Sequence, residues 1–433
     1  MPLKIVHFAL WNHGGAGIAA MRLHEGLRRI GVESAMYVLS KRGEDSAVRL
    51  VPSSMGEPVK SGSESASPAL HKGLRRWQAI KARHPNYSAC MEAFTDLHAD
   101  TRLAELPAFR DADVINLHWV SGLIDFEGDV QSLAGKPVVW TMHDMNPITG
   151  GCHYSGGCER YTAQCGGCPM LGSQVEQDIS RHVWTRKKAA FDRLDLTCVT
   201  PSRWLGECAG RSSIWRGRQR HVIPYGLDTE IYRNHDPKAL RGQLGIPESM
   251  FLILFGAESV ANQRKGFTHT LKALETYRER HGAENVGLVI FGHCPDELAT
   301  QLPFHVYRFG YVTRAEDMSR LYSLADVCIL PSLEDNLPNV GIEALACGLP
   351  VVGFRIGGVP DIVAHGETGY LTESGNVEGL CDGLAWARAE KAVGKAVRLR
   401  CRTRALSMFN LQGQAQAYVQ LYSEILAKRA VQA

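Results

Sequence analysis

The feature that most constrains this chain is a series of short, uniformly apolar segments separated by stretches with helical periodicity. These segments cover residues 5–10, 35–39, 114–117, 138–141 and 196–200, followed by a second set at 251–255, 286–291, 306–309, 327–330 and 351–354. Strands that are apolar on both faces are typical of parallel sheets with helices on either side. The alternation therefore predicts an α/β fold with two doubly wound parallel sheets.

The two sets of strands indicate two similar lobes. Proline and glycine interrupt the pattern between about residues 201 and 245, where we expect the boundary. We divide the chain into residues 1–205, residues 206–408 and a C-terminal amphipathic helix at 409–433. The Ser-, Gly- and Pro-rich stretch 52–69 is expected to be a mobile loop.

Composition narrows the class of protein. The chain has 433 residues with 48 Lys plus Arg against 45 Asp plus Glu, so it is too balanced for an obligate nucleic-acid binder. No apolar stretch approaches the ~18–20 residues that span a bilayer. We expect a cytoplasmic, multi-domain protein.

Two glycine-containing turns between strand and helix are candidate phosphate sites. Gly14, Gly15 and Gly17 follow the first apolar segment, and their backbone could approach an anion at a helix start. A tight turn without a ligand explains them equally well. In the second lobe, Arg264 and Lys265 precede a helix, where the helix dipole disfavours cations unless they serve an anion. A diphosphate fits there, and two solvated surface charges are the alternative.

The segment 331–352 carries the strongest signal. Asp335 lies in a loop after an apolar strand, and Glu343 lies eight residues further on, inside a short helix of apolar residues. Carboxylates at the carboxyl end of parallel strands point toward the ligand crevice of α/β proteins. Glu343 is therefore expected to be buried, and both acids are candidate partners for sugar or ribose hydroxyls.

This segment resembles the E-x7-E region of retaining family-four glycosyltransferases, which have the two-lobed GT-B fold. Further stretches match in the family's order: Gly14-Gly-Ala-Gly17, Ile223-Pro-Tyr-Gly-Leu-Asp228, Arg264-Lys-Gly266 and Gly357-Gly-Val-Pro-Asp-Ile-Val363. Leu117-His-Trp119 and residues 143–154 are similar to bacterial exopolysaccharide enzymes of colanic-acid-cluster type. Two positions depart from the pattern: Asp335 stands where the first Glu is usual, and Ala257 where an Arg is frequent.

The resemblance implies the roles of individual residues. Catalysis is expected from His143, Asp335 and Lys265. Donor binding is expected from Gly15, Gly17, Arg264, Lys265, Asp335, Asn336, Glu343, Gly357 and Gly358. Among these, Glu343 is expected at the ribose, Lys265 at the diphosphate and His143 beside the donor sugar. His118 and Trp119 are candidates for the acceptor side, or alternatively an interior histidine and a packing residue.

The resemblance also implies the reaction. Two lobes facing a cleft, with the last helix crossing back to the first lobe, would transfer a sugar with retention from a UDP- or GDP-linked donor. The expected acceptor is a saccharide, lipid-linked, in exopolysaccharide biosynthesis, and no catalytic metal is expected. A nucleotide-sugar epimerase or a phosphorylase on the same fold is one alternative, and a catalytically silent nucleotide-sugar-binding scaffold is another.

Four of the twelve cysteines cluster in a glycine-rich loop at 150–170: Cys152, Cys158, Cys165 and Cys168. The Cys165-x2-Cys168 pair has zinc-knuckle spacing, and four thiolates would complete a closed structural zinc site. His153 is a substitute ligand. The alternative is four thiols without a metal.

Residues 71–84 contain five Lys or Arg and no acid, and Leu74, Trp77 and Ile80 recur on one helical face. Such a helix could lie on an anionic membrane, which would suit a lipid-linked acceptor and peripheral attachment to the cytoplasmic membrane. A solvated basic helix is the alternative.

Overall fold

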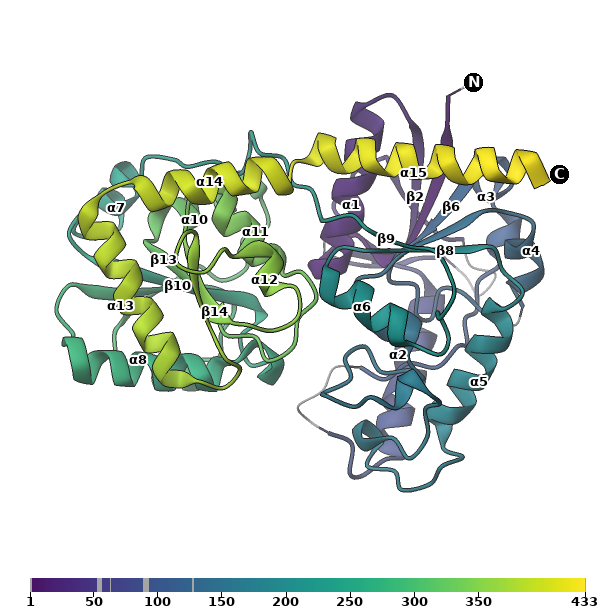
Figure 1. Ribbon diagram of the computed structural model, residues 1–433, viewed down its shortest axis with the longest axis horizontal. Helices are drawn as coiled ribbons and strands as arrows, with labels where there is room; N and C mark the ends of the chain where they lie inside the picture. The colour runs from purple at the N-terminus through teal and green to yellow at the C-terminus, as the bar shows by residue number, and fades with distance from the viewer. Residues whose placement is uncertain (1, 53–56, 63, 89–92, 127, 433) are drawn as a thin grey trace. The chain divides into compact units, whose positions relative to one another are not determined.

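The structure, a computed structural model, describes residues 2–52, 57–62, 64–88, 93–126 and 128–432. The chain forms two compact units, residues 1–226 with 412–433, and residues 227–411 (Figure 1). Each unit is built around its own mostly parallel sheet.

The sheet of the N-terminal unit has the order β4-β5-β2-β1-β6-β7-β8-β9, with β3 beside β2. Neighbouring strands are parallel except for β5 with β2 and β4 with β5. The strands are β1 (Lys4–Trp11), β2 (Glu33–Arg42), β3 (Val48–Leu50), β4 (Val59–Ser61), β5 (Glu64–Ala66), β6 (Val114–Leu117), β7 (Val138–Thr141), β8 (Leu196–Thr200) and β9 (Arg220–Val222).

The helices of this unit pack on both faces of the sheet. They are α1 (Gly14–Arg29), α2 (Pro68–Ala82), η1 (Leu103–Glu105), α3 (Pro107–Asp111), α4 (Val130–Ala134), η2 (Asn146–Ile148), η3 (Arg160–Thr162), η4 (Pro169–Leu171), α5 (Ile179–Phe191), α6 (Arg203–Arg211) and α15 (Leu411–Gln432). α15 shares one core with α1 (Figure 1), and its Tyr418 and Tyr422 hydroxyls bond to Thr141 and Asn116 of the sheet at 2.9 and 2.7 Å.

The sheet of the C-terminal unit is parallel throughout, in the order β12-β11-β10-β13-β14-β15. Its strands are β10 (Phe251–Ser259), β11 (Val286–His293), β12 (His305–Arg308), β13 (Val327–Leu330), β14 (Val351–Phe354) and β15 (Gly369–Thr372). Its helices are α7 (Lys238–Gln243), η5 (Gln263–Lys265), α8 (Phe267–His281), α9 (Asp296–Ala299), α10 (Ala315–Leu324), α11 (Asn339–Ala346), α12 (Val359–Ile362), α13 (Val377–Val393) and α14 (Ala396–Met408).

All ten apolar segments of the sequence are confirmed as strands; β1, β2, β10 and β11 extend beyond the predicted segments, and β12 is shifted by one residue. The strands that the sequence missed are β3, β4, β5, β9 and β15, which are short and not uniformly apolar. The predicted loop 52–69 is wrong in part, because β4 and β5 form an antiparallel pair that extends the sheet at β2. Residues 53–56 and 63 of that loop lie outside the described residues.

The division between the units falls after Gly226, within the expected interval 201–245 but not after residue 205. The reason is that both α6 and β9 belong to the first unit. β9 is a strand of its sheet and pairs with β8, with Cys198 opposite Arg220. The chain leaves the first unit only once this last strand has been added.

The apolar face of α2 packs against the protein itself. Ile80 is buried, and Leu74 and Trp77 pack against the core of the N-terminal unit, whereas Lys72, Arg75, Lys81 and Arg83 are exposed. Insertion of this face into a membrane would therefore require the helix to leave its core. Among the described residues, no helix combines the length and the apolar character needed to cross a bilayer.

Candidate functional site

A cluster of charged side chains lies in the C-terminal unit, where the loops after β10 and β13 meet. The backbone N–H of Leu333 donates to the carbonyl of Arg264 at 2.8 Å, which joins the two loops. The turn at Gly266 has φ +75°, and a Cβ there would lie 2.0 Å from the carbonyl oxygen of Pro331. Only glycine permits this approach, which places Arg264 and Lys265 just before α8.

Two cations converge on Asp335. Lys265 Nζ lies 2.7 Å from Asp335 Oδ2, and Arg264 Nη1 lies 3.4 Å from the same oxygen. Arg264 also donates to the carbonyl of Glu334 at 2.7 Å, and Ser332 donates to Asp335 at 3.2 Å. The sequence predicted Lys265, Arg264 and Asp335 each as residues of the donor site. In the structure, the two cations contact Asp335 directly.

The charge of this cluster is fixed at neutral pH. Burial alone would raise the pKa of Asp335, but Lys265 and Arg264 overcome burial and lower it to about 2. Two cations against one carboxylate leave one net positive charge. Because the Lys265 side chain stays 25% exposed, an incoming anion can reach it.

Glu343 is buried in α11, as the sequence predicted, at 6% exposure. Tyr322 of α10 donates its hydroxyl to Glu343 Oε2 at 2.8 Å. Burial, and next the charge of Glu343, raise the pKa of Tyr322 far above its usual value, so the phenol remains a neutral donor. Sequence reasoning missed Tyr322, because an aromatic residue on an amphipathic helix gives no signal that separates it from ordinary core.

The glycines at 357 and 358 lie directly against the acidic loop. Gly357 has φ +50°, and a Cβ there would lie 1.7 Å from the carbonyl oxygen of Asp335; Gly358 N–H donates to that oxygen at 3.3 Å. Asn336 N–H donates to Asp335 Oδ1 at 3.1 Å. Arg264, Lys265, Asp335, Asn336, Gly357 and Gly358 therefore form one contiguous set, whereas the contact described for Glu343 is with Tyr322.

A second cluster, in the N-terminal unit, is a hydrogen-bonded chain of three imidazoles and a phenol. His7 Nδ1 and His118 Nε2 are 2.9 Å apart, and His118 Nδ1 and His143 Nε2 are also 2.9 Å apart. The chain ends at Tyr225, whose hydroxyl lies 2.7 Å from His143 Nδ1. His7 lies within β1, His118 directly follows β6, and His143 follows β7, so three adjacent strands of the sheet assemble it.

These histidines are neutral at pH 7. Burial lowers the pKa of His143 to about 4, with Asp144 opposing the shift, and it lowers the pKa values of His7 and His118 well below 6.5. His118 is 2% exposed and covered by its two partners, so it supports His143 instead of facing solvent. His7 and Tyr225 were missed by the sequence reasoning; a histidine inside an otherwise apolar strand was the available signal.

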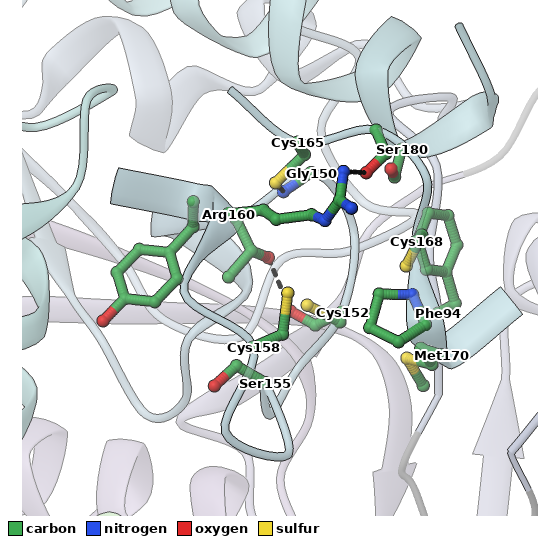
Figure 2. A pocket seen from close by; sticks show the side chains of 14 residues that line it. Phe94, Gly150, Cys152, Ser155, Cys158, Arg160, Cys165, Cys168, Met170 and Ser180 are labelled. Carbon is green, nitrogen blue, oxygen red and sulfur yellow. Dashed lines mark hydrogen bonds between the residues drawn. The ribbon is translucent and has the colours of Figure 1, made fainter. Parts of the chain in front are cut away.

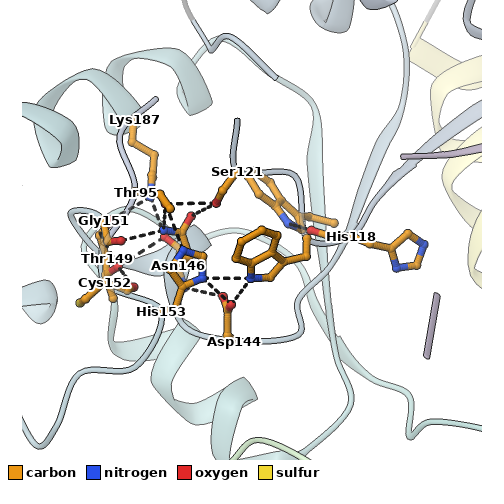
Figure 3. A network of polar contacts seen from close by, with 12 residues as sticks. Thr95, His118, Ser121, Asp144, Asn146, Thr149, Gly151, Cys152, His153 and Lys187 are labelled. Carbon is orange, nitrogen blue, oxygen red and sulfur yellow. Dashed lines mark hydrogen bonds and ion pairs between the residues drawn. The ribbon is translucent and has the colours of Figure 1, made fainter. Parts of the chain in front are cut away.

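Trp119 belongs to a network beside this chain. Its indole N–H donates to Asp144 Oδ2 and to His153 Nδ1, and His153 Nε2 lies 3.1 Å from the Thr95 hydroxyl (Figure 3). Trp119 also stacks on Trp11 with ring centroids 5.0 Å apart. Both nitrogens of His153 are engaged in this network at 2% exposure, and its role as a substitute metal ligand stays a prediction.

The glycines after β1 have a structural explanation. A Cβ on Gly17 would lie 2.6 Å from the carbonyl oxygen of Trp11, so the tight turn from β1 into α1 requires glycine there. Gly15 is exposed in the first turn of α1. Of the two, Gly15 is the one placed where a ligand could approach the backbone.

The four clustered cysteines line one small cavity with Phe94 and Met170 (Figure 2). All four are free thiols, with Cys165 and Cys168 buried and Cys152 and Cys158 partly covered. Within the described part of the chain, no three His, Cys, Asp or Glu side chains are arranged as they stand to hold a metal ion.

Residues 251–388, which contain the Lys265–Asp335 cluster and Glu343, match the family described as "Glycosyl transferases group 1". Among curated proteins, the D-inositol 3-phosphate glycosyltransferase of Pseudarthrobacter chlorophenolicus is 23% identical over 424 residues, covering 90% of this chain and 86% of that protein. The N-acetyl-alpha-D-glucosaminyl L-malate synthase of Bacillus anthracis is 25% identical over 205 residues, which is 46% of this chain and 52% of that protein.

Solved structures share the fold over nearly the whole chain. Sucrose-phosphate synthase from Thermosynechococcus elongatus superposes with a TM-score of 0.66 at 19% identity, covering 98% of this chain and 100% of that one. HepE of Anabaena, in complex with UDP-glucose, superposes with a TM-score of 0.60 at 17% identity and the same coverage. Residues 251–388 thus match a group 1 glycosyl transferase domain, and the chain is an enzyme with the GT-B fold of these solved structures.

Proposed function

We propose that this enzyme transfers a sugar, with retention of anomeric configuration, from a nucleoside diphosphate sugar to a saccharide hydroxyl. The observation that carries the proposal is the pairing of Lys265 and Arg264 on one buried carboxylate, Asp335, within the group 1 domain. The cluster has a net positive charge at the carboxyl ends of parallel strands, where α/β folds bind ligands. A diphosphate is the anion that suits it.

Each residue of the cluster has a proposed role. Lys265 and Arg264 contact the diphosphate, and Asp335 keeps both cations in place. Glu343, oriented by Tyr322, accepts hydrogen bonds from the ribose hydroxyls. Gly357 and Gly358 allow the loop to approach the donor, and Asn336 lies beside them. Gly15 and Gly17, and His143, act from the N-terminal unit as the resemblance implies.

The proposed reaction breaks the bond between the anomeric carbon and the β-phosphate oxygen and forms a new glycosidic bond on the same face. The acceptor hydroxyl loses its proton to the departing diphosphate, which leaves as the nucleoside diphosphate. Negative charge therefore grows on the leaving group, where Lys265 and Arg264 stabilise it. A neutral His143 suits the sugar, because it adds no charge beside an oxocarbenium-like centre. To bond to a sugar hydroxyl it would exchange one of its present partners, His118 or Tyr225.

For the acceptor, we propose a lipid-linked saccharide of exopolysaccharide synthesis. The exposed basic residues of α2 support it, because they could meet an anionic surface or a lipid diphosphate without unpacking the helix. The relatives named above act, by their names, on inositol 3-phosphate and on malate. A small anionic acceptor is therefore the second candidate.

The test is a binding and turnover panel with UDP- and GDP-linked sugars, beginning with UDP-glucose because HepE was solved with it. We expect nucleotide sugars with one of the two bases to raise the melting temperature of the wild type by mass action. The same ligands should not raise the melting temperature of Lys265→Ala. Turnover with lipid-linked saccharides against inositol phosphate and malate then identifies the acceptor, and NMR of the product gives the anomeric configuration. Epimerised donor without acceptor, or binding without any turnover, would overturn the proposal in favour of an epimerase or a silent scaffold.

A further inference from the structure

The cavity between Cys152, Cys158, Cys165 and Cys168 has no part in the proposed transfer reaction. Its volume is about 20 Å³ for the centre of a water-sized sphere, enough for one small species. Besides the thiols, its lining includes the apolar or aromatic side chains of Phe94, Tyr161 and Met170 and the polar side chains of Thr149, Ser155, Arg160 and Ser180. The sulfur atoms are the groups of this lining that bind soft metal ions.

The backbone of this loop is shaped around the thiols. Gly166 and Gly167, between the last two cysteines, have φ of +140° and +51°, and a Cβ on Gly166 would lie 2.3 Å from the carbonyl oxygen of Glu176. A Cβ on Gly150 would lie 2.7 Å from Cys165 Cβ and 3.0 Å from its sulfur. The glycines therefore permit both the tight Cys-x2-Cys turn and the space that Cys165 occupies.

A backbone donor points at one of the sulfurs. Gly150 N–H donates to Cys165 Sγ at 3.1 Å. An N–H group in this position can also bond to a metal-bound thiolate, as outer hydrogen bonds do around metal ligands.

A buried cation lies beside the cavity. Lys187 is 1% exposed, and its ammonium donates to the carbonyl oxygens of Asn146 and Thr149 at 2.6 and 2.9 Å (Figure 3). Cys152, Cys165 and Asp144 lie within its electrostatic reach. Burying an ammonium is costly without negative charge nearby. Asp144 supplies one negative charge, and four thiolates around one divalent ion, with a net charge of −2, would add to it.

We propose that Cys152, Cys158, Cys165 and Cys168 hold one structural metal centre as thiolates, with a zinc ion as the expected occupant. Structural zinc sites are closed and tetrahedral, and sulfur ligands select zinc over harder ions. No three of the four sulfurs are arranged to hold a metal ion as they stand, so metal binding would require the side chains to rotate about their Cα–Cβ bonds within the cavity that all four line. Each thiol that binds releases its proton to solvent.

The centre would hold the loop that follows His143 and Asp144. The Thr149 hydroxyl donates to the carbonyl of Cys152 at 2.6 Å, and Asn146 donates to the carbonyl of Gly151 at 3.0 Å (Figure 3). Asn146 N–H in turn bonds to Asp144 at 2.9 Å. These contacts couple the cysteine loop to the end of β7, so the proposed centre positions this edge of the sheet and takes no part in the reaction. The proposal is independent of the sugar that the enzyme transfers.

The experiment measures zinc, iron and acid-labile sulfide in the full-length protein, purified without oxygen and without added metal. We expect one zinc per chain, released when an organomercurial titrates the thiols and detected by a chromogenic chelator. Iron with sulfide and absorbance near 400 nm, lost on the same titration, would keep the four-thiolate centre and identify an iron–sulfur cluster as its occupant. No metal, with all four thiols reacting freely in the folded protein or oxidised in pairs, would overturn the proposal.

Variants separate the centre from general stability. Cys165→Ser and Cys168→Ser should each reduce bound metal at least tenfold, whereas Cys198→Ala, a buried cysteine of β8 outside the cluster, should retain it. If the serine variants fail to fold, the titration of the wild type still decides. Wild-type metal content in a folded Cys168→Ser protein would contradict the assignment of that ligand.

Discussion

The two polar clusters of this enzyme solve different electrostatic problems. In the C-terminal unit, Lys265 and Arg264 lie 2.7 and 3.4 Å from Asp335, whose pKa they lower to about 2. In the N-terminal unit, burial lowers the pKa of His143 to about 4, so that cluster carries no net charge on its imidazoles at neutral pH. One cluster is charged at every physiological pH, and the other is neutral because it is buried.

The difference suits the role that we propose for each cluster. A diphosphate needs positive charge that does not titrate away, and a carboxylate that holds two cations provides it. The imidazole chain is proposed to act near a sugar, where neutral rings add no charge. Perturbing each cluster should therefore affect different quantities.

The largest effect is expected from Lys265→Ala. Loss of this ammonium removes stabilisation of the leaving diphosphate, so kcat/KM for the donor should fall by about 10²–10³-fold, as for removal of one oxyanion donor. Lys272→Ala, an exposed lysine on α8, is the control and should leave turnover unchanged. Steady-state kinetics measure both, and equal activity in the two variants would dissociate the charged cluster from the reaction.

Acid should affect the neutral cluster first. The folded-state pKa of His143 is about 4, and so is that of His24 on α1, whose ring packs against His7; both lie below the unfolded value near 6.5, because burial disfavours the imidazolium. The unfolded chain therefore binds protons first, and stability is lost as pH falls from about 6.5 to about 4, by about 3 kcal/mol for His143 alone. Asp335 contributes stability that is lost only below about pH 4, as pH falls toward 2.

Hydrogen exchange followed by mass spectrometry between pH 7 and 4.5, corrected for intrinsic rates, distinguishes the units. Protection of β1, β6 and β7 should fall more than that of β10 and β13, although half-buried His235 and His269 add a smaller effect in the C-terminal unit. Equal loss in both units would contradict the view that burial of histidines separates them.

A weaker effect is expected from cutting the imidazole chain. His118→Phe retains the ring stacking on His143, at a centroid distance of 5.2 Å, but removes the hydrogen bond to it. We expect kcat to fall about tenfold with little change in donor KM, in the range of lost positioning partners. His118→Asn keeps a polar partner and should recover part of kcat. If both variants have a lower melting temperature but an unchanged kcat, His118 is a packing residue.

The strands could be predicted because helices cover both faces of each sheet, which makes uniformly apolar segments visible in the sequence. Burial of Glu343 was predictable for a related reason, since apolar residues surround it in the sequence. The boundary between the units was harder to predict from the sequence. β9 has the sequence Arg-His-Val, which is not an apolar segment, and it forms a strand only by pairing with β8.

The contacts within the clusters could not be predicted, because they depend on how distant loops and strands align. Lys265 and Asp335 are seventy residues apart and meet because Gly266 and Pro331 come into contact. His7 and His118 meet because Phe8 lies opposite Leu117 in the pairing of β1 with β6. A shift of one residue in that pairing would move the imidazoles to opposite faces of the sheet.

The smallest effect is expected from Tyr322→Phe. This substitution sharpens the comparison, because it removes a neutral hydrogen-bond donor from a carboxylate of the C-terminal unit. Its hydroxyl is 2.8 Å from Glu343 Oε2, and burial keeps it protonated. Loss of this hydrogen bond leaves the carboxylate charged but less firmly oriented, so donor KM should rise about fivefold, roughly 1 kcal/mol, with kcat unchanged. Tyr277→Phe, another fully buried tyrosine of the same unit, whose hydroxyl accepts from Arg388 at 3.3 Å, should change melting temperature alone. An unchanged KM in Tyr322→Phe would mean that its helix alone holds Glu343 in place. Hydrogen bonds from neutral groups would then orient side chains only in the histidine chain.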